Sequence, residues 1–182
     1  MKNKSAVFIL VSSIIINILV KGSLKSLGIF LLELKNQGIE TSEAAWIPAI
    51  AFTCFSLFSS PVAWCREKTS SRLLSVLGGL MVSVGFLISY LLYLPILYTG
   101  LGVLLGVGGC MATISGSLEI NRVFQGSRLG TAHGLSLAGS TAGGLLVPVL
   151  VAYLIFTWGY RGAVLLQAAI LLHTIPASLF YR

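Results

Sequence analysis

The sequence predicts an all-α polytopic membrane protein with a single domain of six transmembrane helices over residues 1–182. Three observations support this prediction. The chain is 56% hydrophobic and only 9% charged, a composition typical of membrane proteins. Apolar runs of about 20 residues, the length that spans a bilayer, recur along it. The distribution of Lys and Arg between these runs favours an even number of spans.

The predicted spans are joined by short polar connections, which leave no room for a soluble domain. In order, the spans cover residues 5–34, 44–64, 73–93, 95–118, 130–156 and 161–180.

The first span is longer than a hydrocarbon core requires, and it contains two lysines. Lys21 and Lys25 stand four positions apart, so on a helix they share a face and repel each other. A charge in hydrocarbon costs about 2.5–3.5 kcal/mol, and no acidic residue precedes Glu33 in this segment. Either the side chains extend to the outer interface, or they face a water-filled cavity that attracts an anionic substrate. The helix length predicts the outer part of the membrane, or just above it, for Lys25.

The same segment also has the outline of a secretory signal peptide, with a basic head, an apolar body and small residues after it. Apolar sequence resumes directly after Lys25, which favours a membrane-spanning helix. A signal peptide would leave five spans and would reverse the charge count given below.

The second span contains Pro48 and Pro61, which can bend a membrane helix. The third span follows the basic connection CREKTSSR. The fourth and fifth spans are rich in glycine, and the sixth begins at Arg161 after a short turn.

Small residues at four-residue spacing mark the fourth and fifth spans. This spacing lets helix backbones approach closely in lipid, either as static packing or as faces that slide during a conformational cycle. Pro148 follows them in the fifth span and can kink it. The pairs are Gly102 and Gly106 in the fourth span, and Gly130 and Gly134, then Gly139 and Gly143, in the fifth.

Positive charges are distributed unequally between the two sides of the predicted bundle. With the N-terminus in the cytoplasm, eight fall inside and only Lys35 and Arg161 fall outside. This bias predicts an integral membrane protein with both termini in the cytoplasm. The inner residues are Lys2, Lys4, Arg66, Lys68, Arg72, Arg122, Arg128 and Arg182.

Several function classes are excluded by the residue content. The net charge of +7 is scattered between apolar runs, whereas nucleic-acid binding needs a basic stripe. The cysteines lack metal-binding spacing, Asp is absent, and no nucleophile motif occurs. We therefore expect no enzyme, metal site or cofactor. His133, among glycines, is either a structural group or a proton carrier, and we interpret His173 as structural.

Three segments, in order along nearly the whole chain, resemble the monocarboxylate transporter family of the major facilitator superfamily. They are KSLGIFLLELKNQGIETSEAAWIPAIA, FQGSRLGTAHGLSLAGSTAGGLLVP and GYRGAVLLQAAILLH. The resemblance implies the first six helices of a twelve-helix transporter. Such a protein moves small monocarboxylate-type anions, together with protons, by alternating access between two halves.

The resemblance also implies roles for individual residues. Lys25 falls on the family's first-helix lysine, which binds the substrate carboxylate. His133 falls where members often have a cavity-facing Asn, Arg128 on a basic residue of the fifth-helix signature, and Arg161 on the arginine of a Gly-aromatic-Arg-Gly turn. Lys21 stands where some members carry an aromatic residue, which argues against ordinary lactate-type specificity.

Because the resemblance covers only a first half, we expect a fragment or truncated product. The implied partners are an organic anion, protons, and either a C-terminal half or a second copy. A single-span accessory glycoprotein and a plasma-membrane location are implied as well. The alternative is a non-transporting membrane protein or subunit that associates through its glycine-rich helix faces.

Overall fold

The computed structural model describes residues 2–181, with the backbone alone described for residues 2–5 and 127. Every regular element in this range is helical, as the sequence predicts. The elements are α1 (Lys2–Asn36), α2 (Thr41–Ala44), α3 (Trp46–Leu57), α4 (Ser59–Lys68), α5 (Ser71–Ile88), the 3₁₀ turn η1 (Ser89–Leu91), α6 (Leu94–Leu97), the π-helical stretch η2 (Tyr98–Leu104), α7 (Leu105–Val123), α8 (Ser127–Leu172) and α9 (Thr174–Ser178).

Four helical stretches in the described range are long and apolar enough to cross a membrane. The bent pair of α2–α3 and α4, with an angle of 43° between its two parts, adds a fifth if it is counted as one span. The last stretch has 51 residues, which at about 1.5 Å per residue is more than twice the thickness of a hydrocarbon core. The four stretches are Ala6–Asn36, Ser71–Leu91, Leu94–Val123 and Arg128–Ser178.

The long α8 changes direction at Gly159, whose φ of 67° and ψ of −179° are not helical. Glycine is required here, because a side chain at this positive φ would be strained. Before Gly159, the chain runs parallel to α1, because its contacts move toward higher residue numbers on both helices. After Gly159, it runs antiparallel to α1, because the contacts move toward lower residue numbers on α1. The pairs are Ser13–Ser136 and Ile18–Gly143 before the reversal, and Phe30–Tyr160, Ser23–Gln167 and Phe8–Phe180 after it.

This reversal falls between the fifth and sixth spans that the sequence predicts. The six-span count itself stays a prediction, since the criterion of length and apolarity gives four or five spans.

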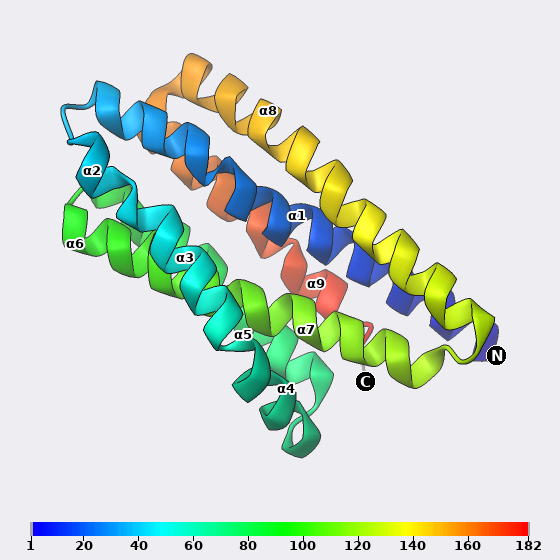
Figure 1. Cartoon of the computed structure of the whole chain (residues 1–182). Coiled ribbons are helices and arrows are strands. Elements are labelled where there is room, and N and C mark those ends of the chain that lie inside the picture. Colours follow the sequence, from blue (N-terminus) through cyan, green and yellow to red (C-terminus); the bar gives the residue numbers. More distant parts are fainter. Residues whose placement is uncertain (1, 182) are drawn as a thin grey trace.

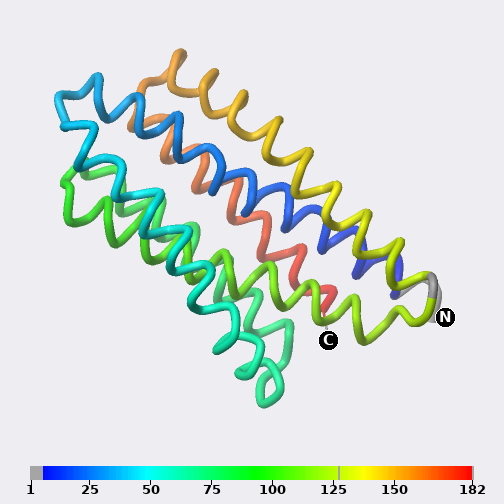
Figure 2. The backbone as a smooth tube through the Cα atoms, viewed as in Figure 1, coloured from blue at the N-terminus to red at the C-terminus, as the bar shows by residue number. Residues whose placement is uncertain are grey.

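The helix α1 lies in the middle of the bundle, between the two parts of α8, and also contacts α7 (Figure 1). Its side chains Ile16 and Val20 are fully buried. The start of α1 and the helix α9 lie at the same end of the bundle (Figure 2), where Phe8 and Phe180 stack with ring centroids 5.5 Å apart. The two ends of the described chain therefore lie on one side, as an even number of spans requires.

The other predicted helix breaks have local causes. The bend in the second span falls at Phe58, between α3 and α4, and Pro61 stands in the first turn of α4. Proline is tolerated at that position because the amide it lacks would have no helical partner there. At the start of α5, the Ser70 hydroxyl accepts a hydrogen bond from the Leu73 amide at 3.3 Å and caps the helix.

Candidate functional site

A glycine seam joins α1 to the first part of α8. A Cβ atom added to Gly143 would lie 2.6 Å from the Ile18 Cα, and one added to Gly139 would lie 2.9 Å from Ile14 Cγ2. One added to Gly22 would lie 2.8 Å from Val147 Cβ. Close approach at small residues is the main source of helix association in lipid. The packing predicted for Gly139 and Gly143 is therefore confirmed, and Gly22 adds to it.

Buried polar side chains hold α1 in register with both parts of α8. Asn17 Nδ2 donates to Ser136 Oγ at 2.9 Å, and Ser13 Oγ lies 3.0 Å from the same oxygen. On the other side of Gly159, Gln167 Nε2 donates to Ser23 Oγ at 2.7 Å. Hydrogen bonds of this kind between membrane helices contribute about 1 kcal/mol each. They fix how α1 is rotated against α8.

Lys25 is exposed, and its side chain lies over Gly144 of α8. A Cβ atom on Gly144 would come 2.6 Å from the Lys25 Nζ and 3.0 Å from its Cε. Gly144 follows Gly143, which contacts Ile18 and Gly22 of α1. The ammonium group therefore points back toward the turn that precedes Lys25, because helical side chains tilt toward the N-terminus.

This direction places the Lys25 ammonium far from the ends of the helices. Gly144 stands near the middle of the part of α8 that runs from residue 127 to residue 158. The 17 residues before it and the 14 after it correspond to about 25 Å and about 21 Å of helix, each more than half of a hydrocarbon core of about 30 Å. The contact with Gly144 lies away from the outer end of α1, and the depth of Lys25 in the membrane stays a prediction. Snorkelling to the outer interface would also need the opposite side-chain direction.

Lys21 lies one turn before Lys25 on the same face and is half-buried. In the described part of the chain, neither ammonium group makes a hydrogen bond or an ion pair. Glu33 lies two turns beyond Lys25, about 12 Å along the axis, where it accepts hydrogen bonds from Asn36 and Gln37. Two positive charges without an ion-pair partner thus lie on one face of α1.

His133 is not brought together with the lysines. Its Nε2 lies 2.6 Å from Asn121 Oδ1, across the turn between α7 and α8. It precedes Gly144 by eleven positions in one continuous helix, or about 17 Å. Its proposed part in substrate binding stays a prediction, and its observed contact is a structural hydrogen bond.

The signature residues lie at the ends of the bundle. Arg128 lines a shallow apolar hollow with Leu10 and Phe124. The Arg161 guanidinium lies over the Tyr90 ring, 5.2 Å from its centroid, in a cation–π contact. The Arg161 contact joins α8 to η1.

Close packing is not found at every predicted glycine. Gly102 and Gly106 do meet α3, with added Cβ atoms 2.9 Å from Ile50 Cγ2 and 2.8 Å from Cys54 Cβ. Gly130 and Gly134 have nothing within 4 Å inside the described bundle, so packing of this pair against another helix stays a prediction. Pro148 is half-buried inside α8 without disturbing its helical backbone, because the non-helical residue of α8 is Gly159.

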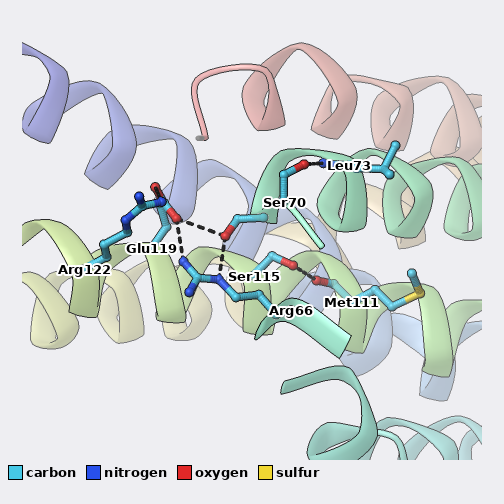
Figure 3. Close-up of polar contacts among 8 residues, drawn as sticks. Arg66, Ser70, Leu73, Met111, Ser115, Glu119 and Arg122 are labelled. Carbon is cyan, nitrogen blue, oxygen red and sulfur yellow. Dashed lines mark hydrogen bonds and ion pairs between the residues drawn. The ribbon is translucent and has the colours of Figure 1, made fainter. Parts of the chain in front are cut away.

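A charged cluster joins α4, α5 and α7 at the end of the bundle where α9 lies (Figure 3). Arg66 Nη2 lies 2.9 Å from Glu119 Oε2, and the Ser71 hydroxyl donates to the same oxygen at 2.9 Å. Arg122 is 4.0 Å from the other carboxylate oxygen. Glu119 is only 1% exposed, and a buried charge of this kind must be paired.

Sequence reasoning missed this cluster, because it treated Arg66 and Arg122 as loop charges. The available signal was Glu119, a carboxylate near the end of an apolar span with Arg122 three positions later. Its partner Arg66 is 53 positions away, so the sequence alone did not pair them. Lys2 and Lys4, which the charge count also used, have undescribed side chains, and Arg182 lies outside the described residues.

Comparison with known proteins agrees with this arrangement. The model of the Major Facilitator Superfamily matches residues 6–182. Monocarboxylate transporter 11 of Mus musculus is 31% identical over 92% of this chain and 38% of its own length. The Homo sapiens protein of that name is 33% identical over 90% of this chain and 35% of its own length.

Solved structures show the same fold. A POT family transporter crystallised with 5-aminolevulinic acid superposes with a TM-score of 0.79, at 17% identity, over 93% of this chain and 37% of its own. The chain thus spans less than two-fifths of the curated relatives named above. The family model matches nearly the whole length of this helical bundle. The chain therefore belongs to the Major Facilitator Superfamily, and the resemblance to its monocarboxylate transporters is confirmed.

Proposed function

We propose that this chain forms the first six-helix half of a twelve-helix transporter that moves small organic anions by alternating access. The curated relatives are named for monocarboxylate transport, which supports an anionic substrate of that class. The reversal of α8 at Gly159 supports six spans, because it divides a helix that is too long for one crossing.

The observation that carries the proposal is the position of Lys25. Its ammonium group rests on Gly144 near mid-depth of an apolar helix and has no acidic partner in the described residues. An ionisable group inside a membrane protein usually faces the bundle interior or a water-filled cavity, and it marks a substrate pathway. A carboxylate is the ligand that such an unpaired cation favours.

A second wall is needed to enclose this site. The first part of α8 exposes a row of large apolar side chains, among them Leu145, Val149 and Phe156, at 68%, 70% and 90% exposure. We assign this surface to lipid and to a second set of helices, supplied by a C-terminal half or by a second copy. The positive-inside bias assigns both termini to the cytoplasm of a plasma-membrane protein.

Proton linkage, in this proposal, depends on His133. It stands at the turn between α7 and α8 and shares a short contact with Asn121, and histidine is the side chain that most readily changes charge near neutral pH. Uptake driven by external acid would support the linkage, and uptake that is independent of the pH gradient would contradict it.

The alternative, a subunit that associates through its glycine faces, is less well supported. Gly102, Gly106, Gly139 and Gly143 already contact α3 or α1 inside the bundle, which leaves Gly130 and Gly134 as the predicted glycine pair open to a partner.

The test is uptake of radiolabelled butyrate by cells that express the full-length protein containing this chain, with and without Lys25→Ala. We expect the variant to lose at least about tenfold in uptake, since a charge-assisted contact contributes about 1.5–3 kcal/mol. Lys35→Ala, on the exposed last turn of the same helix, serves as the matched control. Equal uptake by wild type and Lys25→Ala at equal surface expression would refute the proposal for Lys25.

A further inference from the structure

The site contains two cations where one carboxylate needs only one. Lys21 and Lys25 are one helical turn apart on α1, a spacing at which Cβ atoms are about 5–6 Å apart. The contact with Gly144 turns the Lys25 side chain back toward the turn that contains Lys21. The two ammonium groups therefore lie about one helical turn apart or closer on the same face of α1.

No counter-charge for the pair lies in the described part of the chain. Five acidic residues occur in the sequence, and three of them, Glu33, Glu40 and Glu119, are engaged elsewhere. Glu43 lies beyond the end of α1, in α2, and Glu67 lies in α4. A single bound carboxylate would leave one positive charge unbalanced among apolar helices, where unpaired charge is costly.

We propose that Lys21 and Lys25 together bind a dianion, a short dicarboxylate whose two carboxylate groups each pair with one ammonium group. This inference rests on the proposed transport function and specifies its substrate class. Lys25 binds the first carboxylate against Gly144, and Lys21, half-buried one turn away, binds the second. The ligand neutralises the site, and Lys21 thereby determines specificity between doubly and singly charged acids.

The experiment compares uptake of two four-carbon acids, succinate with two carboxylates and butyrate with one. Full-length protein is used at slightly alkaline pH, where both carboxyl groups of succinate are ionised. The measured quantity is the ratio of the two kcat/KM values. For wild type we expect succinate to be preferred, and for Lys21→Gln we expect the ratio to fall by about 10- to 100-fold, the loss of one charge-assisted pair.

Two further variants separate charge from folding. Lys21→Arg retains the charge and should retain most of the succinate preference, whereas Lys35→Gln, on the exposed last turn of α1, should leave the ratio unchanged. Thermal stabilisation of the purified protein by succinate, measured against butyrate, gives a second readout that does not depend on surface expression.

The outcomes distinguish this inference from the function on which it rests. Butyrate uptake without a succinate preference, or an equal loss of both substrates in Lys21→Gln, overturns the dianion site and leaves anion transport standing. An equal loss of both substrates would indicate that Lys21 pairs with a carboxylate on the other helices of the full-length protein. Absence of uptake of either acid by well-expressed wild type overturns the transport function, and this inference with it.

Discussion

Gly143 and Gly144 are adjacent in α8 and give a sharp test of how Lys25 is held, because a methyl group meets different atoms at each. At Gly144 it meets the flexible Lys25 side chain, whereas at Gly143 it meets the Ile18 backbone, with the carbonyl carbon 2.8 Å away. Gly144→Ala should therefore displace the ammonium group without harming the fold. Gly143→Ala should force two helices apart.

The size of the first effect follows from the geometry. Ordinary contact begins at 3.4 Å, so Nζ must move about 0.8 Å from its present 2.6 Å. Lengthening an ammonium–carboxylate distance from about 4 to about 4.8 Å, at an effective dielectric constant of about 20, loses about 0.7 kcal/mol, or about threefold in affinity. Overpacking at Gly143 costs about 1–3 kcal/mol of stability.

The assay combines the KM for anion uptake with the melting temperature of the purified protein. We expect Gly144→Ala to raise KM about threefold with an unchanged melting temperature, and Gly143→Ala to lower the melting temperature. An unchanged KM in Gly144→Ala, or equal loss of stability in both variants, would refute the contact between Lys25 and α8.

Three other predictions concern residues outside the proposed anion site. Arg66→Gln leaves the buried carboxylate of Glu119 without its close partner and should lower stability by about 3–5 kcal/mol; the double variant with Glu119→Gln should recover much of this loss in the same thermal denaturation. Gly159→Ala forces a side chain into a left-handed conformation, so it should lower stability by about 1–3 kcal/mol, and a melting temperature equal to wild type would contradict the reversal at this residue. His133→Ala removes the hydrogen bond to Asn121 and should cost about 1 kcal/mol in denaturation without altering the ratio of succinate to butyrate uptake, whereas a changed ratio would link this residue to the anion site.

Much of the helical pattern could be predicted from hydropathy, because each membrane-spanning segment is apolar over its own length. The gap between residues 156 and 161 in the predicted spans contains Gly159, where the chain reverses. The predicted start of the fourth span at residue 95 lies one position from the observed start of α6 at Leu94. Local sequence contains these signals, so no tertiary information was needed.

The site was less accessible to sequence reasoning, because it depends on which helix lies beside α1. Four-residue spacing made Gly130 and Gly134 equivalent to Gly139 and Gly143, yet only the second pair meets α1. Gly144, outside any predicted pair, is the residue that receives Lys25. The direction of a lysine side chain follows from such a contact and is not encoded in the α1 segment alone.

The charged cluster of Arg66, Ser71, Glu119 and Arg122 could not be predicted from the sequence for a related reason. Glu119 and Arg66 come from different spans, and periodicity within one helix says nothing about partners on another. The burial of Glu119, at 1% exposure, was the decisive feature, and only the packing of α4, α5 and α7 reveals it.

The central claim is that Lys25 faces a water-filled anion pathway at mid-depth of the membrane. It is tested most directly by Lys25→Cys in a full-length background without other cysteines, treated with a negatively charged, membrane-impermeant thiol reagent. Ile16→Cys, at a fully buried position of the same helix, is the control that should stay unlabelled. We predict that this reagent labels position 25; labelling there only by a lipid-soluble maleimide would contradict the claim.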